Sequence, residues 1–349
     1  MTLSVLVAGG GALGATIAFE LARRGVCVTV ADPVAPGDNA SGVAGGMLAP
    51  AFECLLDPLA PAFSLLQASR DLWPDLAGLI GLQLARDGAL AVAAPDDIEA
   101  MGGRLTTLGA RFQVLDHDEL GRRVPWLLSG RPAIWTSEDW LLSPAGALTA
   151  LRAGAEAGGA RWRRASVVRF EAGRADLSDG ESVACDKLVI ATGASRSLAD
   201  LAPELGVLTP IKGQILRWPA LALSGPVVRV NGAYVCPSPC GVSVGSTMEP
   251  GREDLAIDSS AVESLRGAAS GIVPALLGGP VEARAGVRAA TPDGLPLVGP
   301  AARPGVWLAV GARRNGWLLA PLIARVTAEG LTGSALESQA TLFHPARFG

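Results

Sequence analysis

Several residue types that carry acid–base and metal chemistry are scarce in this chain of 349 residues. It has one tyrosine and two histidines, His117 and His344, and only two of its 29 basic residues are lysines, Lys187 and Lys212. The histidines lie far apart in the sequence, and no Ser–His–Asp set or metal-ligand spacing is evident. Hydrolase chemistry is therefore a poor interpretation, and we expect no metal.

Cysteine and long apolar runs are also limited. The five cysteines are an odd number and no signal-peptide pattern precedes the first apolar segment, which favours reduced thiols and a cytoplasmic location. Cys236 and Cys240 are spaced like a metal pair, but no second pair accompanies them, which favours ordinary thiols near a turn. No run of 18 apolar residues lacks charges or breakers, so we expect no membrane span.

The net charge and the length limit the possible partners and the number of domains. A formal charge of −4 gives no electrostatic reason to expect nucleic acid or an anionic membrane as a partner. The length suggests about two domains, and the 49% of hydrophobic residues can form a large core.

The most informative segment is residues 3–32. An apolar run, residues 3–8, predicts a buried strand; Gly9, Gly11 and Gly14 then satisfy G-x-G-x-x-G, and residues 15–24 have the periodicity of a helix. A second strand over 26–30 leads to Asp32, 21 residues after Gly11. This order predicts a dinucleotide site in which the helix N-terminus receives a pyrophosphate and Asp32 accepts from a ribose hydroxyl.

Two later segments repeat the strand–glycine pattern. VLVAGG (5–10), LVIATG (188–193) and WLAVGA (307–312) are each an apolar strand that ends at a glycine turn. Ligands of open α/β sheets lie beyond the carboxyl ends of the strands, so these three ends can enclose one extended ligand.

Ser143 and Pro144 predict a helix start, and segments 161–170 and 174–177 predict a hairpin.

The predicted fold class is α/β, with a discontinuous Rossmann-like nucleotide-binding domain and a second α+β domain built on an antiparallel sheet. The nucleotide-binding domain takes residues 1–84, 141–207 and 286–349, and the second domain, over the ligand, takes residues 85–140 and 208–285.

The chain resembles the FAD-dependent D-amino-acid oxidase superfamily over nearly its whole length, and most closely the glycine oxidases. The matching segments are AGGGALGATIAFELARRG, ASGVAGGMLAP followed by Glu53, KLVIATGAS, GVRAATPDGLPLVG and GARRNGWLLAP. The resemblance implies a flavin oxidase of glycine, sarcosine or short D-amino acids, in which a hydride passes from the substrate Cα to flavin N5. The products would be an imino acid and hydrogen peroxide, with molecular oxygen as the acceptor.

The resemblance also implies roles for individual residues. Arg288 and Arg314 match the positions that meet the substrate carboxylate, and Tyr234 matches a substrate-side tyrosine. The implied contacts to a non-covalent FAD are Gly9, Gly11, Ala12, Leu13, Gly14, Asp32 and Pro33 at the ADP half, Ala40, Ser41, Gly45, Gly46 and Met47 beside the flavin, Val168 at the adenine, Gly193 and Gly311 at strand ends, and Ala312, Arg313, Arg314, Asn315, Gly316, Trp317 and Leu318 beneath the isoalloxazine.

The residues alone leave several alternatives open. Arg288 lies in an apolar segment and is equally compatible with a salt bridge to an acidic residue of the second domain. Tyr234 and Met47 are compatible with ordinary core packing. Ala312 and Ser238 stand where glycine oxidases often carry a histidine and a basic residue, so the substrate is less well defined than the cofactor.

Three functions remain at this point. The first is the amino-acid oxidase. The second is an FAD-dependent amino- or imino-acid dehydrogenase that uses another electron acceptor. The third is a non-catalytic nucleotide-binding protein, and a homo-oligomer is compatible with each. An oxidase of modified tRNA is disfavoured because the chain is acidic and has no basic patch.

Overall fold

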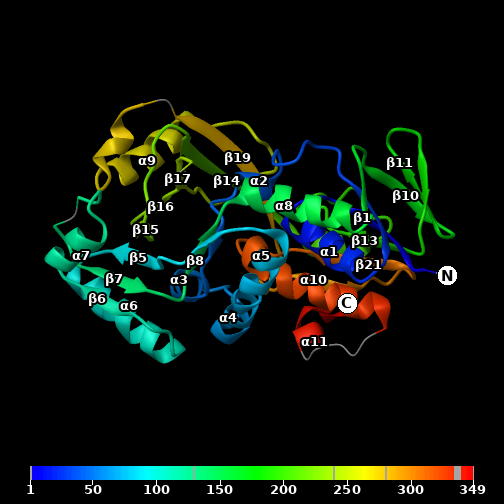
Figure 1. The fold of residues 1–349 in the computed structure, drawn as a ribbon, viewed down its shortest axis with the longest axis horizontal. Helices are drawn as coiled ribbons and strands as arrows, with labels where there is room; N and C mark the ends of the chain where they lie inside the picture. Colours follow the sequence, from blue (N-terminus) through cyan, green and yellow to red (C-terminus); the bar gives the residue numbers. More distant parts are fainter. Residues whose placement is uncertain (1, 129, 239, 280, 334–338, 349) are drawn as a thin grey trace.

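Two large β-sheets form the two halves of the molecule in Figure 1. The computed structural model describes residues 2–128, 130–238, 240–279, 281–333 and 339–348. One sheet has six strands and the other has nine. The mixed α/β class predicted from the sequence is confirmed.

The six-stranded sheet contains all three of the predicted strand–glycine segments. Its central strands run parallel and only one edge strand is antiparallel. In spatial order the strands are β20 (Leu297–Pro300), β21 (Val306–Val310), β13 (Lys187–Ile190), β1 (Ser4–Ala8), β2 (Cys27–Ala31) and β9 (Arg161–Arg163). The glycine turns after β1, β13 and β21 therefore meet at one edge of the sheet.

Different layers cover the two faces of this sheet. Along β1, Val5 and Val7 pack among the helices, whereas Leu6 and Ala8 pack toward a small antiparallel sheet, because successive side chains of a strand point to opposite faces. The helices are α1 (Ala12–Arg23), α8 (Pro144–Ala157) and α10 (Gly316–Thr332), and the small sheet is β10 (Val167–Glu171), β11 (Arg174–Leu177) and β12 (Ser182–Ala184).

Local signals predicted some of these elements well. Helix α8 begins at Pro144, and the Ser143 side chain accepts a hydrogen bond from the Gly146 N–H at 3.2 Å, as the sequence predicted. The predicted hairpin is only partly correct. Its turn joins β10 to β11, but residues 161–163 form β9, which pairs with β2 in the large sheet instead.

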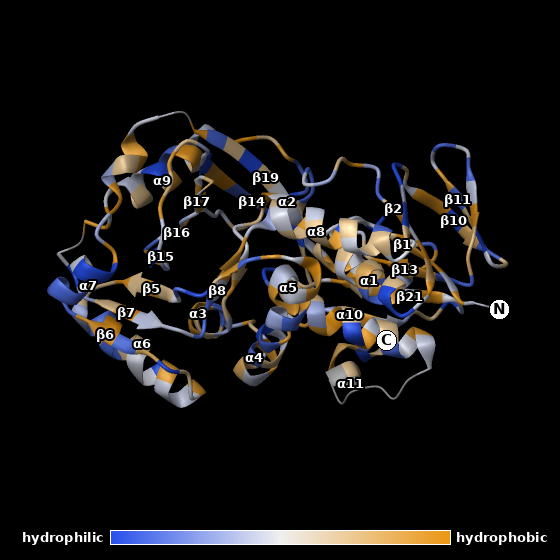
Figure 2. Cartoon of the chain, in the orientation of Figure 1, coloured by the Kyte–Doolittle hydropathy of each residue, from blue (hydrophilic) through white to orange (hydrophobic). Residues whose placement is uncertain are grey.

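The nine-stranded sheet is mainly antiparallel. Strand β19 pairs with β14 from Thr209↔Ala290 to Arg217↔Glu282, and its charged and apolar residues appear as bands in Figure 2. The strands are β5 (Ala89–Val92), β6 (Gln113–Leu115), β7 (Ala133–Thr136), β14 (Thr209–Trp218), β15 (Val227–Val230), β16 (Ala233–Cys236), β17 (Val242–Gly245), β18 (Glu249–Pro250) and β19 (Glu282–Ala290). The helical elements of this half are α6 (Pro95–Leu108), α7 (His117–Arg123), α9 (Ser259–Ser270) and η2 (Pro274–Leu277).

Strand β19 crosses the predicted domain boundary between residues 285 and 286, because it belongs to the nine-stranded sheet over its whole length.

The remaining elements connect the two halves or complete the half that contains the six-stranded sheet. The remaining elements are α2 (Ala40–Val43), β3 (Met47–Leu48), α3 (Pro50–Leu56), α4 (Phe63–Asp71), α5 (Trp73–Ile80), β4 (Leu84–Ala85), β8 (Trp140–Leu142), η1 (Pro203–Val207), α11 (Gln339–Phe343) and η3 (Pro345–Phe348). In the described part of the chain, no helix has the length and apolar character needed to span a membrane.

Candidate active site

A cavity of about 470 Å³ is lined by residues of both large sheets. Its walls include Ala8 at the end of β1, Ala191 after β13, Tyr234 on β16 and Arg288 on β19. The cavity therefore begins at the carboxyl ends of the parallel strands, where open α/β sheets bind ligands, and reaches the second sheet.

The glycine turn between β1 and α1 is held by two side chains. Asp32 accepts a hydrogen bond from the Gly10 N–H at 2.6 Å, and Ser41 Oγ accepts from the Ala12 N–H at 2.8 Å. Gly14 is required for close packing, because a Cβ there would overlap the Gly9 carbonyl. The turn thus places the start of α1 against the cavity, where the positive end of the helix dipole is suited to an anion.

Most of the predicted site residues line this single cavity, although they come from distant parts of the chain. Those that line it are Gly9, Gly11, Ala12, Leu13, Asp32, Pro33, Ala40, Ser41, Gly193, Tyr234, Arg288, Gly311, Ala312, Arg313, Arg314, Gly316 and Trp317.

The other predicted residues lie behind or beside the lining. The Val168 side chain is 58% exposed on β10, and its neighbour Val167 lines the cavity; the expected contact of the Val168 backbone with the adenine stays a prediction. Met47 contacts Arg229 through its sulfur, and Gly45 packs against the ring of Tyr234. The residues outside the lining are Gly14, Gly45, Gly46, Met47, Val168, Asn315 and Leu318.

The guanidinium of Arg288 has only neutral partners among the described residues. It donates to Ser246 Oγ at 2.9 Å, to the Thr247 carbonyl at 3.3 Å and to the Met248 sulfur at 3.5 Å. The salt bridge to an acidic residue that the sequence left open is not formed by any described carboxylate. Burial lowers the pKa of Arg288, but an arginine remains charged.

Two residues that the sequence analysis missed make room for Arg288 and orient it. Gly213 on β14 lies two residues from the register partner of Arg288 on β19, and a Cβ at position 213 would overlap the guanidinium. Ser246 follows β17 and supplies the shortest hydrogen bond to Arg288. The position of Gly213 inside the apolar strand 209–218 was the available signal, because a glycine within a strand often marks a place where another group lies close to the backbone.

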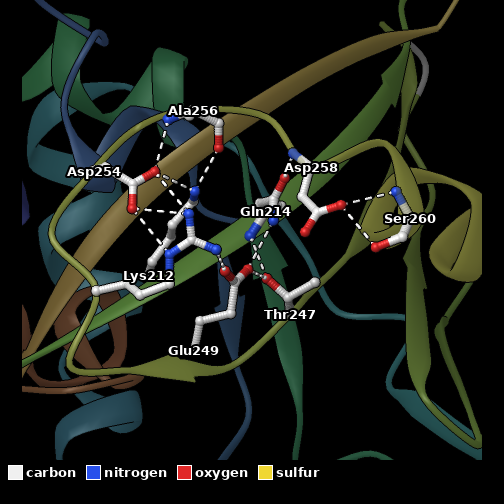
Figure 3. A network of polar contacts seen from close by, with 9 residues as sticks. Lys212, Gln214, Thr247, Glu249, Asp254, Ala256, Asp258 and Ser260 are labelled. Atoms are coloured by element: carbon white, nitrogen blue, oxygen red, sulfur yellow. Dashed lines mark hydrogen bonds and ion pairs between the residues drawn. The ribbon is translucent and has the colours of Figure 1, made fainter.

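A polar network fixes the segment that carries these partners (Figure 3). Lys212, whose side chain is fully buried, forms an ion pair with Asp254 at 2.6 Å, and Gln214 donates to Glu249 at 2.7 Å. Thr247 donates to the same Glu249 at 2.6 Å. The segment 246–258 is thereby attached to β14, and its residues 246, 253 and 255 line the cavity.

The other two cavity-lining arginines each have an acidic partner. Arg313 forms an ion pair with Asp57. Arg314 lies with Nε 3.1 Å from Glu53 Oε2 and donates from Nη2 to Glu53 Oε1 at 3.2 Å. Glu53 also accepts from Arg229 at 3.2 Å, so one buried carboxylate joins two arginines.

Asp139 is a buried acid beside this cluster. Burial raises its pKa to about 7, although the Arg229 charge and hydrogen bonds from the Ala51 and Phe52 N–H groups oppose the rise. Those hydrogen bonds hold the start of α3, which carries Glu53.

Tyr234 is buried on β16, and its ring lies against Gly45 and Gly245. Burial raises the pKa of its hydroxyl above the ordinary value. The phenol is therefore neutral near pH 7 and able to donate a hydrogen bond. In the part of the chain that the structure describes, no cluster of three or more His, Cys, Asp or Glu side chains is arranged to hold a metal.

The cavity fits the flavin dinucleotide that the resemblance implies. Glycines at the turn remove side chains where a pyrophosphate would approach. The lining also includes two continuous segments of the chain, from Ala285 to Ala289 and from Val310 to Arg314. A helix N-terminus and arginines in one cavity match a phosphate-bearing cofactor next to an anionic substrate.

Comparison with known proteins assigns the family. The model of the family described as FAD dependent oxidoreductase matches residues 4–330. The chain belongs to this family, and FAD is its cofactor. It is an FAD-dependent oxidoreductase of the glycine oxidase and D-amino-acid oxidase type.

Individual relatives agree with this assignment. The chain is 30% identical to a glycine oxidase of Pseudomonas putida, and the alignment covers 96% of each protein. It is 29% identical to MnmC of Chromohalobacter salexigens, a bifunctional protein of tRNA 5-methylaminomethyl-2-thiouridine biosynthesis. That alignment covers 98% of this chain and 56% of MnmC.

Solved structures show the same fold. Glycine oxidase from Geobacillus kaustophilus has a TM-score of 0.87 at 28% identity, covering 99% of this chain and 98% of that one. Iminodiacetate oxidase from Chelativorans sp. BNC1 has a TM-score of 0.87 at 25% identity, covering 98% of both.

Proposed function

We propose that this family member oxidises small amino acids, with glycine, sarcosine or a short D-amino acid as the substrate, and that it gives an imino acid and hydrogen peroxide. The observation that carries the proposal is Arg288, a cation that lines the cavity while its described partners are all neutral. A carboxylate ligand would supply the missing negative charge, and a guanidinium can bind its two oxygens with parallel hydrogen bonds.

The surroundings of Arg288 support a specific substrate orientation. Ser246, Thr247 and Gly213 fix the guanidinium, so little side-chain entropy is lost when a ligand binds. Tyr234 lines the same cavity as Arg288, and its neutral hydroxyl can donate a second hydrogen bond to the same carboxylate. These residues orient the acid group, which leaves the Cα–H of the substrate to face the cofactor.

Other residues of the chain would hold FAD. The start of α1 and Asp32 would bind the ADP half, and the segment 311–317 would lie beside the isoalloxazine. When FAD is bound, the redox chemistry would be that of the flavin, as acceptor of a hydride from the substrate Cα. The residues around it position the substrate and exclude water, in agreement with the small number of histidines in the chain.

Anaerobic addition of candidate substrates to the FAD-loaded protein tests this function. Glycine, sarcosine and D-alanine are expected to bleach the visible flavin absorbance, whereas ethylamine, which lacks a carboxylate, is expected to do so far more slowly. Equal rates for ethylamine and glycine would contradict the role of Arg288.

Readmission of air then separates the oxidase from the alternatives. Stoichiometric hydrogen peroxide supports the oxidase. Bleaching by amino acids that is reversed only by an artificial electron acceptor would indicate a dehydrogenase, and the absence of bleaching by any amino acid would indicate a binding protein.

A further inference from the structure

The three arginines that line the cavity differ in the charge that faces them. Arg313 has Asp57 as its partner and Arg314 has Glu53. Arg288 has no acidic partner among the described residues. The lining therefore contains one cation open to a carboxylate ligand and two that already have a carboxylate.

Glu53 is held firmly against Arg314. Its carboxylate meets Arg314 at two points, at 3.1 and 3.2 Å, and its Oε1 also accepts from Arg229. Only 4% of Glu53 and 5% of Arg229 are exposed, and Arg229 also lies over the ring of Phe52 at 5.4 Å. Water and salt screen such buried charges poorly, so the field of Glu53 at Arg314 is strong.

We propose that Glu53 is a positioning residue that keeps Arg314 occupied and thereby restricts the site to amines that bear one carboxylate. A second carboxylate at Arg314 would have to displace Glu53 or lie beside it. Displacement would leave a buried carboxylate with fewer hydrogen bonds, and proximity would bring two negative charges together. This inference rests on the proposed function, in which Arg288 binds the first carboxylate.

Two unreactive ligands provide a direct test with the FAD-loaded protein. Methoxyacetate has the shape of sarcosine with an ether oxygen in place of nitrogen, and oxydiacetate has the corresponding shape of iminodiacetate with two carboxylates. Binding of each is measured by calorimetry and by the change in the flavin absorption spectrum at constant ionic strength. We expect the wild-type protein to bind methoxyacetate at least tenfold more tightly.

Substitution of Glu53 then tests its part in this preference. In Glu53→Gln, Arg314 loses its anionic partner, so we expect the ratio of the two dissociation constants to shift at least tenfold toward oxydiacetate. Glu53→Asp retains the charge and should retain the wild-type preference. Glu138→Gln is the matched control, because Glu138 is likewise buried between two arginines, Arg70 and Arg111, but neither of these arginines lines the cavity.

The outcomes separate this inference from the proposed function. If wild-type protein binds methoxyacetate but Glu53→Gln keeps the wild-type ratio, the role of Glu53 is wrong and the function stands. If wild-type protein binds oxydiacetate as tightly as methoxyacetate, the inference is wrong even where Glu53→Gln fails to retain FAD. If neither ligand binds and no amino acid bleaches the flavin, the proposed function itself fails.

Discussion

The backbone of Gly213 lies against the guanidinium of Arg288, so closely that a methyl group at position 213 would overlap both terminal nitrogens. The two residues are on neighbouring strands, β14 and β19, and Gly213 pairs in register with Gly286. The position of Arg288 therefore depends on the absence of a side chain on the adjacent strand.

This relationship gives the first prediction. Gly213→Ala should displace Arg288 and weaken binding of a carboxylate ligand by about tenfold or more, because a charge-assisted pair is sensitive to geometry. FAD content should stay near that of the wild type. The measurement is the dissociation constant of methoxyacetate together with flavin occupancy. Gly103→Ala is the control, since position 103 on α6 has open space and Ala favours a helix; equal affinities in both variants would contradict the prediction.

Arg288 itself can be tested by changing its shape and then its charge. Arg288→Lys keeps the charge but loses the two-pronged geometry, so we expect ligand binding to weaken by about tenfold to a hundredfold. Arg288→Ala should weaken it further while FAD content stays near normal. Anaerobic titration gives the affinity, and melting temperature monitors the fold. Arg104→Lys, at an exposed site on α6, is the control for arginine replacement. A stable, fully flavinated Arg288→Ala protein with unchanged affinity would exclude Arg288 as the carboxylate anchor.

The attachment of the flavin is also predictable. Residues 286–291, which precede the Pro292–Asp293 pair, contain Arg288 and no cysteine, and none of the described residues that line the cavity is a cysteine whose sulfur could bond the flavin. We therefore expect non-covalent FAD. Acid precipitation should leave the yellow colour in the supernatant, and colour retained in the protein pellet would show that this expectation is wrong.

A buried ion-pair network away from the cavity predicts a pH effect on stability. Burial alone would raise the pKa of Glu138, but hydrogen bonds and charges from Arg111 and Arg70 outweigh it and lower the pKa to about 2. The unfolded pKa is near 4.5. Glu138 therefore stabilises the fold fully above about pH 4.5, and this stabilisation is lost as the pH falls toward 2.

The corresponding variant is Glu138→Gln. At pH 7 it should be less stable by about 3 kcal/mol, because Arg70 loses a buried partner. The difference from the wild type should shrink below pH 4.5, as measured by urea unfolding over a pH series. A difference in unfolding free energy that stays constant from pH 7 to pH 3 would exclude ionisation of Glu138 as the source of the pH effect.

Local signals in the sequence were sufficient for the parts of the site that are close together along the chain. The glycines from 9 to 14, with Asp32 after the second strand, predicted the turn between β1 and α1, because each glycine has a local backbone or packing reason. Ser143 and Pro144 likewise predicted the start of α8, where the cap is made within four residues.

Contacts between distant segments could not be predicted in the same way. Glu53 and Arg314 are separated by 261 residues, and no local pattern indicates that they pair. The resemblance implied that Arg314, like Arg288, contacts the substrate carboxylate. This contact stays a prediction, and the ion pair between Arg314 and Glu53 makes it less favourable.

The cavity has a consequence for synthesis of the chain on the ribosome. Its walls begin at Ala8 and end at Trp317, and β21 completes the sheet beside β13 while α10 covers α1. A nascent chain that ends before Val306 carries the complete glycine motif but only part of the pocket. Capture of FAD is therefore expected only after β21 and the start of α10 have been synthesised, and a ribosome-bound fragment that ends before Val306 should be colourless.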